Sequence, residues 1–166
     1  QFGLLSSHAR CHGTTPREPW EFGENAVRIF KKFARLRYRL LSYLYSYAAT
    51  ARDTGLPVVR PLVLEYEDDP VTRDVGLQYL LGKELLVAPV FDESGRVDVY
   101  LPEGDGWVDY WTRERYDGGQ TLRREEPLDR LPLFVRAGSI LPMHEPSQTV
   151  EKGTPEMVTL RVTPPN

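Results

Sequence analysis

The strongest hydrophobic pattern in the chain lies between residues 24 and 53. Apolar side chains recur there at spacings of three and four, at Val27, Phe30, Phe33, Leu36, Leu40, Leu44 and Ala48. This period places the apolar side chains on one helical face and predicts a single long helix over 24–53. Glu24 suits the positive end of the helix dipole, and Gly55 followed by Pro57 is a stop signal. Additional apolar residues widen the face, so the helix needs a sheet or several neighbours to pack against.

The pattern changes after residue 56 to short apolar runs separated by turn-forming residues. One short helix is predicted over 68–82, capped by Asp69, begun by Pro70 and ended by Gly82. Short strands are predicted at the start of the chain (FGLL, 2–5) and at 57–66, 84–91, 96–102, 106–111, 120–125, 131–138, 139–143 and 157–164. A succession of short alternating strands predicts an antiparallel β-sandwich.

Composition and charge narrow the class of protein. The 166 residues carry a net charge of −3 with dispersed basic residues, which argues against a nucleic-acid surface. No apolar run of about 18 residues exists, so no membrane partner is predicted. The single cysteine precludes an internal disulfide, which favours a cytoplasmic location and leaves secretion open. Because the sequence starts with Gln1 and an apolar run, we expect it to begin inside a larger fold.

The polar stretch SSHARCHG (6–13) is the main candidate for chemistry. A metal site is disfavoured, because His8, Cys11 and His12 lack a fourth ligand and lie in a loop broken by Gly13. A Cys11 nucleophile with a neighbouring histidine base is also disfavoured, since adjacent residues of an extended segment rarely reach the required geometry. From these residues alone a structural interpretation is favoured. In it His8 is half-buried, Cys11 fills an apolar gap, and Arg10 pairs with a carboxylate. No metal or cofactor is predicted.

Six blocks in order provide further information: LLSSHARCHGTTPREPWEFG, ARLRYRLLSYLY, PVVRPLVLEYEDDP, QYLLGKELLVAPVF, VYLPEGDGWVDYWTRERYDGGQ and LPLFVRAGSILPM. Together they resemble glycoside hydrolase family 31, which contains α-glucosidases and α-xylosidases. The opening block is most similar to the bacterial α-xylosidase branch. The resemblance implies an α/β plus all-β fold. Residues 1–57 would be the C-terminal end of a (β/α)8 barrel, 58–145 a proximal β-sandwich domain, and 146–166 the start of a further β domain or tail.

The resemblance also implies roles for individual residues. The Arg-x-His pattern of the family falls on Arg10 and His12, and the family histidine hydrogen-bonds sugar hydroxyls in the cleavage subsite. His12 is therefore the predicted substrate-binding residue, with Arg10 bracing the loop through a carboxylate. An imidazole suits this role, because it can donate to one hydroxyl and accept from another.

Catalysis in this family is retaining hydrolysis by two aspartates on earlier barrel strands, and their motifs are absent from this sequence. The aspartates that are present, such as Asp68, Asp69, Asp74 and Asp109, are predicted to lie in turns, caps or the sandwich. We therefore expect no catalytic residue here and an inactive chain when residues 1–166 are expressed alone.

The predicted activity is hydrolysis of terminal α-linked xylose or glucose, on an oligosaccharide or glycoside substrate. The choice between α-xylosidase and α-glucosidase stays open, as does a homo-oligomer. The alternative from another class is a non-catalytic carbohydrate-binding or structural β module. Such a module would expose a row of aromatic side chains. Trp107, Tyr110 and Trp111 are instead predicted to belong to the core and rim of the sandwich.

Overall fold

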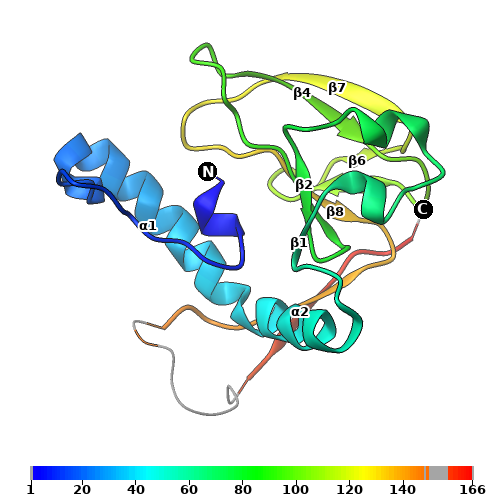
Figure 1. Ribbon diagram of the computed structural model, residues 1–166, viewed down its shortest axis with the longest axis horizontal. Coiled ribbons are helices and arrows are strands. Elements are labelled where there is room, and N and C mark those ends of the chain that lie inside the picture. The colour runs from blue at the N-terminus through cyan, green and yellow to red at the C-terminus, as the bar shows by residue number, and fades with distance from the viewer. Residues whose placement is uncertain (1, 148, 150–156, 166) are drawn as a thin grey trace.

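The computed structural model describes residues 2–147, 149 and 157–165. Two helices, α1 (Glu24–Arg39) and α2 (Leu41–Thr54), precede a region of antiparallel β-sheets (Figure 1). The strands are β1 (Val59–Arg60), β2 (Tyr79–Leu81), β3 (Leu85–Val87), β4 (Arg96–Leu101), β5 (Trp107–Asp109), β6 (Arg115–Tyr116), β7 (Gln120–Glu125), β8 (Leu133–Arg136), β9 (Ile140–Met143) and β10 (Thr159–Val162). No helix in the described residues is long and apolar enough to cross a membrane.

Within this described part the strands form one large sheet and two small ones. The large sheet has the order β1-β2-β3-β8-β5-β6, and every neighbouring pair is antiparallel. Strands β4 and β7 form a second sheet, and β9 pairs with β10 in a third. This arrangement agrees with the predicted antiparallel β-sandwich.

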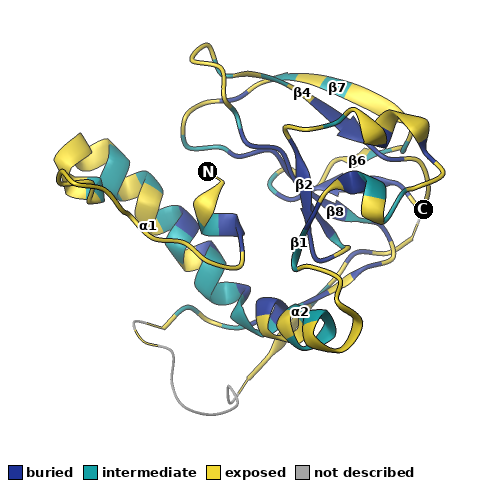
Figure 2. Cartoon of the chain, viewed as in Figure 1, coloured by how far each residue is buried: buried dark blue, intermediate teal, exposed yellow. Residues whose placement is uncertain are grey.

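Both faces of the large sheet are covered, which explains why β2 and β3 are buried at every position. One face, which includes Tyr79, Leu81 and Val135, packs against the helices and β9. The opposite face, which includes Leu80 and Phe134, packs against β4 of the second sheet. Figure 2 shows that burial is concentrated in these layers, whereas the N-terminal half of α1 is largely exposed. The alternation follows the two-residue period of a strand.

The prediction of one helix over 24–53 is wrong in one respect, because the helix is broken at Leu40. The backbone there has φ −90° and ψ 6°, outside the helical region, and the direction of the chain changes (Figure 1). Neither Pro nor Gly causes the break. Leu40 is fully buried in the core, and the break allows α2 to pack on β9 while α1 runs past the N-terminal loop. Gly55 ends α2 in the left-handed conformation, as predicted.

Two other predicted elements take a different form. The FGLL segment is a 3-10 turn over Gly3–Leu5 rather than a strand, and only Leu5 of it is buried. The helix predicted over 68–82 is limited to a 3-10 turn at Pro70–Arg73, after which the chain enters β2. Asp69 caps that turn as predicted, by accepting a hydrogen bond from the Val71 amide. Gly82 does not end a helix; it lies in the turn between β2 and β3 with φ +65°.

The predicted strands are largely found, but most are shorter. The run 57–66 contains only β1, followed by a 3-10 turn at Leu62–Leu64. The prediction at 120–125 matches β7, whereas β6 was missed. The predicted segment 146–166 lies partly outside the described residues. Its described strand, β10, pairs with β9. The division of the chain at residues 57 and 145 stays a prediction.

Candidate functional site

The base of the polar loop is held by one arginine of α1. Arg37 donates from Nη1 to the carbonyl oxygens of Leu4 and Ser6 and from Nη2 to that of Ser7, at 3.2, 2.5 and 2.9 Å. The hydroxyl of Tyr79 on β2 donates to the Leu5 carbonyl at 2.9 Å. A guanidinium is well suited to this task, because its donors form a rigid planar fork. The loop is therefore fixed at its start to both the helix and the large sheet.

The tip of the loop is exposed, and it carries the polar residues singled out from the sequence. His8, Arg10, Cys11 and His12 all face solvent. The ring of His8 contacts the Ser7 hydroxyl at 3.1 Å. The expectations of a half-buried His8 and of Cys11 as an apolar filler are therefore wrong. Neither side chain belongs to the two buried apolar clusters of the described residues.

Arg10 contacts His12 rather than a carboxylate, which corrects the predicted ion pair. Its Nη2 is hydrogen-bonded to Nδ1 of the His12 ring. Arginine carries donors only, so Nδ1 must accept this hydrogen bond. The proton of the neutral ring is then on Nε2, and this N–H is left available as a donor. The pair thus presents two kinds of donor on an exposed loop, which suits hydroxyl groups of a sugar.

Metal binding has no support from the side-chain positions. Among the described residues there is no group of three or more His, Cys, Asp or Glu side chains placed to hold an ion. His8 and His12 use their Nδ1 atoms for Ser7 and Arg10, respectively.

The aspartates named from the sequence occupy structural positions, as predicted. Asp69 is buried and accepts from the Val71 and Glu103 amides and from the Tyr100 hydroxyl. Asp68 and Asp74 are exposed.

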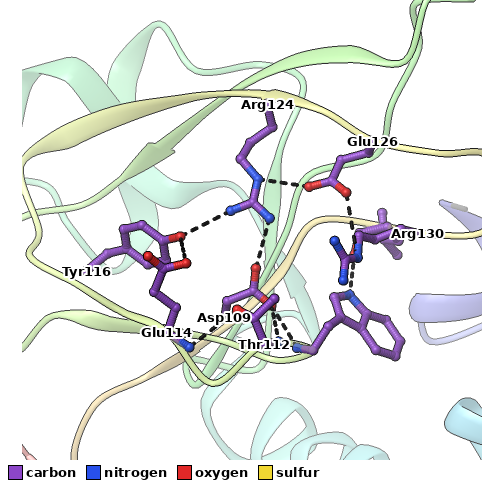
Figure 3. A network of polar contacts seen from close by, with 9 residues as sticks. Asp109, Thr112, Glu114, Tyr116, Arg124, Glu126 and Arg130 are labelled. Carbon is purple, nitrogen blue, oxygen red and sulfur yellow. Dashed lines mark hydrogen bonds and ion pairs between the residues drawn. The ribbon is translucent and has the colours of Figure 1, made fainter.

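A cluster around Arg124 forms a polar network in the sandwich (Figure 3). Nη2 of Arg124 lies 3.0 Å from Asp109, and its Nε lies 2.8 Å from Glu126. Oδ1 of Asp109 also accepts from the Trp111 and Thr112 amides. Burial lowers the pKa of the Arg124 guanidinium, but the hydrogen bond and charge of Glu126 and the charge of Asp109 outweigh it and raise the pKa.

This Arg124 cluster ties β7 to β5 and the following turn, so its role is structural. Asp109 and Glu126 are both bound to the Arg124 guanidinium, and Asp109 also accepts from two backbone amides. A retaining glycosidase would instead need two carboxyl groups facing a substrate.

The aromatic residues on and after β5 belong to the core and its rim, as predicted. Trp107 is 1% exposed and donates from Nε1 to the Pro102 carbonyl at 3.0 Å. Tyr110 is also buried, and the half-buried Trp111 donates to the Leu131 carbonyl. Trp20 is the exposed exception, at 66%. It lines an apolar hollow of about 490 Å³ at the start of α1, which does not include His12.

Sequence reasoning missed Arg37 as the anchor of the loop. The signal was weak, since Arg37 lies in a helix with several other basic residues, ARLRYR. Only the packing of α1 against the Gly3–Leu5 turn gives this arginine three carbonyl partners.

Comparisons with known proteins agree with this arrangement. Residues 1–47 match the TIM-barrel domain of glycosyl hydrolases family 31, and residues 55–141 match the family 31 C-terminal domain. Alpha-glucosidase 2 of Bacillus thermoamyloliquefaciens is 41% identical over 155 residues, which is 91% of this chain and 20% of that protein. An alpha-xylosidase of Saccharolobus solfataricus is 38% identical over 166 residues, covering 99% of this chain and 23% of that protein.

A solved structure is also similar over nearly the whole chain. The family 31 dextranase of Flavobacterium johnsoniae, complexed with glucose, superposes with a TM-score of 0.92 at 42% identity. The match covers 99% of this chain and 21% of the dextranase. The chain therefore spans about a fifth of the length of these relatives.

Proposed function

Because the chain belongs to glycosyl hydrolase family 31, we propose that the protein is a retaining α-glycosidase in which His12 binds the substrate. The substrate is an oligosaccharide or glycoside with a terminal α-linked xylose or glucose. Residues 1–166 contribute part of the binding site at the end of the barrel. The two catalytic carboxylates come from other parts of the protein, since the aspartates named above are in turns and caps or bound to Arg124.

The Arg10–His12 contact is the observation that carries this proposal. The hydrogen bond from Arg10 leaves the Nε2–H of His12 as a donor on an exposed loop. Such a donor can bind a sugar hydroxyl next to the bond that is cleaved. The anchor provided by Arg37 keeps the loop in place, so little conformational entropy is lost when the sugar binds.

The chemistry that His12 supports is stabilisation of a charged transition state. In retaining hydrolysis one carboxylate attacks the anomeric carbon while the other carboxyl group protonates the leaving oxygen. Hydrogen bonds to the sugar hydroxyls strengthen as the ring approaches an oxocarbenium ion. A histidine that donates to a hydroxyl therefore contributes more in the transition state than in the ground state, which raises kcat as well as affinity.

The terminal sugar of the substrate can be xylose or glucose, and the relatives include both an alpha-xylosidase and an alpha-glucosidase. An α-xylosidase would exclude the C5 hydroxymethyl group of glucose, and an α-glucosidase would accommodate it. We favour α-xylosidase activity on the basis of the opening sequence block. A non-catalytic β module is disfavoured, because the exposed row of aromatics that it requires is replaced by the buried Trp107 and Tyr110.

The decisive experiment compares His12→Ala with His8→Ala in the full-length protein. A hydrogen bond to a charged transition state is worth about 1.5–3 kcal/mol, so His12→Ala should lower kcat/KM about 10- to 150-fold. His8→Ala is the matched control, since His8 is also exposed and its ring contacts Ser7 rather than Arg10. The measurement is kcat/KM on aryl α-xyloside and aryl α-glucoside. A large loss of kcat/KM in His8→Ala, together with a near-normal kcat/KM in His12→Ala, would contradict the assignment of His12 as the substrate-binding residue.

Three further measurements address the rest of the proposal. Residues 1–166 expressed alone should not turn over either aryl glycoside, and turnover that is lost on replacing an aspartate of this chain would refute the placement of the carboxylates elsewhere. Arg10→Met should lower kcat/KM by a smaller factor than His12→Ala, because the imidazole remains but its tautomer is no longer held. Treatment with a chelator should leave activity unchanged, and a loss would reopen metal binding.

A further inference from the structure

The polar loop starts from a point that is fixed in the core. The Gly3–Leu5 turn before it lies beside α1 and next to the large sheet (Figure 1). Leu5 is 1% exposed and belongs to the apolar cluster that the helices and the sheet share, and Ser6 is also buried. The chain becomes exposed at Ser7. The position of the loop tip therefore depends on the contacts of the residues that directly precede it.

One of these contacts comes from a different part of the protein. Tyr79 lies on β2, within the residues that match the family 31 C-terminal domain, whereas the loop lies within those that match the TIM-barrel domain. The Tyr79 hydroxyl is 2.9 Å from the Leu5 carbonyl oxygen and 3.3 Å from that of Phe2. The Tyr79 ring meets the Phe2 ring edge to face, with 5.3 Å between the centroids. Both acceptors precede the loop, so this hydroxyl attaches the loop to the sandwich.

A side chain at the base of the loop extends this attachment towards the tip. The Ser6 hydroxyl lies 2.6 Å from the His8 carbonyl oxygen and 2.8 Å from that of Gly3, and its single hydrogen serves one acceptor at a time. The contact with His8 closes the backbone turn from which the exposed tip departs towards His12. A continuous path of hydrogen bonds and backbone thus runs from Tyr79 on the sheet to the segment that carries His12.

We propose that Tyr79 is a positioning residue for His12: its hydroxyl holds the start of the loop, and the loop holds the imidazole at the sugar. This assignment rests on the proposed role of His12, and it adds that the β-sandwich takes part in substrate binding through the loop. The packing of the ring does not require the hydroxyl, because a phenylalanine would fill the same space. A misplacement of about 1 Å can lower a rate about 100-fold, so a single hydrogen bond at the base of the loop affects catalysis.

The first test compares Tyr79→Phe with Tyr43→Phe in the full-length protein. Tyr43 is the matched control, because it lies in the same apolar cluster, is 2% exposed and also donates to a backbone carbonyl, that of Leu81. Tyr79→Phe should lower kcat/KM on aryl α-xyloside and aryl α-glucoside about 2- to 13-fold, the range for losing one neutral hydrogen bond. Tyr43→Phe should keep the wild-type value. Equal values of kcat/KM for the two variants would overturn the proposal.

The second test determines whether Tyr79 acts through His12. In a His12→Ala background, Tyr79→Phe should change kcat/KM by less than about 2-fold, because the loop then has no imidazole to position. A tyrosine that only stabilises the fold would lower kcat/KM by the same factor in both backgrounds. An undiminished loss in the His12→Ala protein would therefore overturn the proposal.

The third test does not depend on activity. Cys11 is exposed and precedes His12 directly, so a trifluoromethyl label on its thiol reports on the loop by fluorine NMR. Cys11→Ser protein, labelled in the same way, identifies the signal of Cys11. Tyr79→Phe should change the position or width of this signal, and Tyr43→Phe should not.

The label also separates failure of this proposal from failure of the proposed function. An unchanged Cys11 signal in Tyr79→Phe, or an equal change in both tyrosine variants, would overturn the positioning role. If His12→Ala were as active as wild type, the proposed function would fail, and the Cys11 signal would still decide whether Tyr79 holds the loop.

Discussion

Gly82, in the turn between β2 and β3, cannot be replaced by alanine without two separate penalties. Its φ of +65° is a conformation that side-chain-bearing residues rarely adopt. A Cβ atom at this position would also collide with the Tyr43 hydroxyl oxygen and with a ring carbon of Tyr47. Both tyrosines come from α2, so the turn is a point of very close approach between the helix and the large sheet.

The tyrosines cannot move away without loss. The Tyr43 hydroxyl lies 2.6 Å from the Leu81 carbonyl and 2.8 Å from Oε2 of Glu84, and the Tyr47 hydroxyl donates to the same Oε2 at 2.5 Å. The left-handed backbone costs alanine about 1–2 kcal/mol. The forced displacement adds about 1–3 kcal/mol for overpacking and about 1 kcal/mol for a weakened hydrogen bond. Gly82→Ala should therefore lower the free energy of unfolding by about 3–6 kcal/mol.

Gly138→Ala is the matched control, because Gly138 has φ +76° and a Cβ added there would meet no atom within 4 Å. It should cost only the backbone contribution, about 1–2 kcal/mol. The measurement is urea denaturation of wild type and both variants. In addition, Tyr43→Phe should cost less in the Gly82→Ala background than in wild type, since the colliding hydroxyl is then absent. Equal destabilisation by the two glycine variants, within about 0.5 kcal/mol, would refute the argument from close packing.

Three further outcomes follow from the structure. Arg124→Ala should lower the free energy of unfolding by about 3–5 kcal/mol, because Asp109 stays buried without its cation and Glu126 keeps only the longer ion pair with Arg130. Urea denaturation should show almost no effect of the control Arg123→Ala, and a loss below about 1 kcal/mol for Arg124→Ala would contradict a structural role. Trp107→Ala should lower the free energy of unfolding by about 3–5 kcal/mol, because it truncates a core side chain, whereas Trp20→Ala should leave stability unchanged. A larger loss for Trp20→Ala than for Trp107→Ala would contradict the core position of Trp107. Burial raises the pKa of Tyr43, Tyr47 and Tyr79 in the folded state above the ordinary value of 10.0, with Glu84 adding to the rise for Tyr43 and Tyr47. Because the unionised phenols are favoured in the folded state, their contribution to stability is complete below pH 10 and is lost as the pH rises beyond it. Absorbance at 295 nm should therefore show these phenols ionising only together with unfolding. Ionisation of all nine tyrosines while the circular dichroism spectrum stays native would contradict this.

The sequence predicted those structural features that depend on residues close together in the chain, such as helix starts, helix ends and turns. Asp69 and Pro70 specify a helical start, and Gly55 a helix end, through geometry that the chain imposes on itself. The apolar period of residues 24–53 predicted the buried positions Phe33, Leu36 and Leu44, whereas Phe30 and Ala48 of the same pattern are exposed. The order of short strands likewise follows from turn formers and alternating apolar residues, as in the match of β7 at both ends.

The tertiary structure decided the features that depend on partners distant in sequence. Leu40 breaks the helix because its burial against the sheet outweighs the continuation of a helical backbone, and no local signal marks that residue. Arg10 contacts His12 instead of a carboxylate, because the path of the exposed loop brings that ring to its guanidinium. Arg37, Arg39 and Arg161 look alike in sequence. Only their surroundings give the first its three carbonyl partners and leave the other two with buried, unused donors, because desolvation and hydrogen bonding are set by how the whole chain packs.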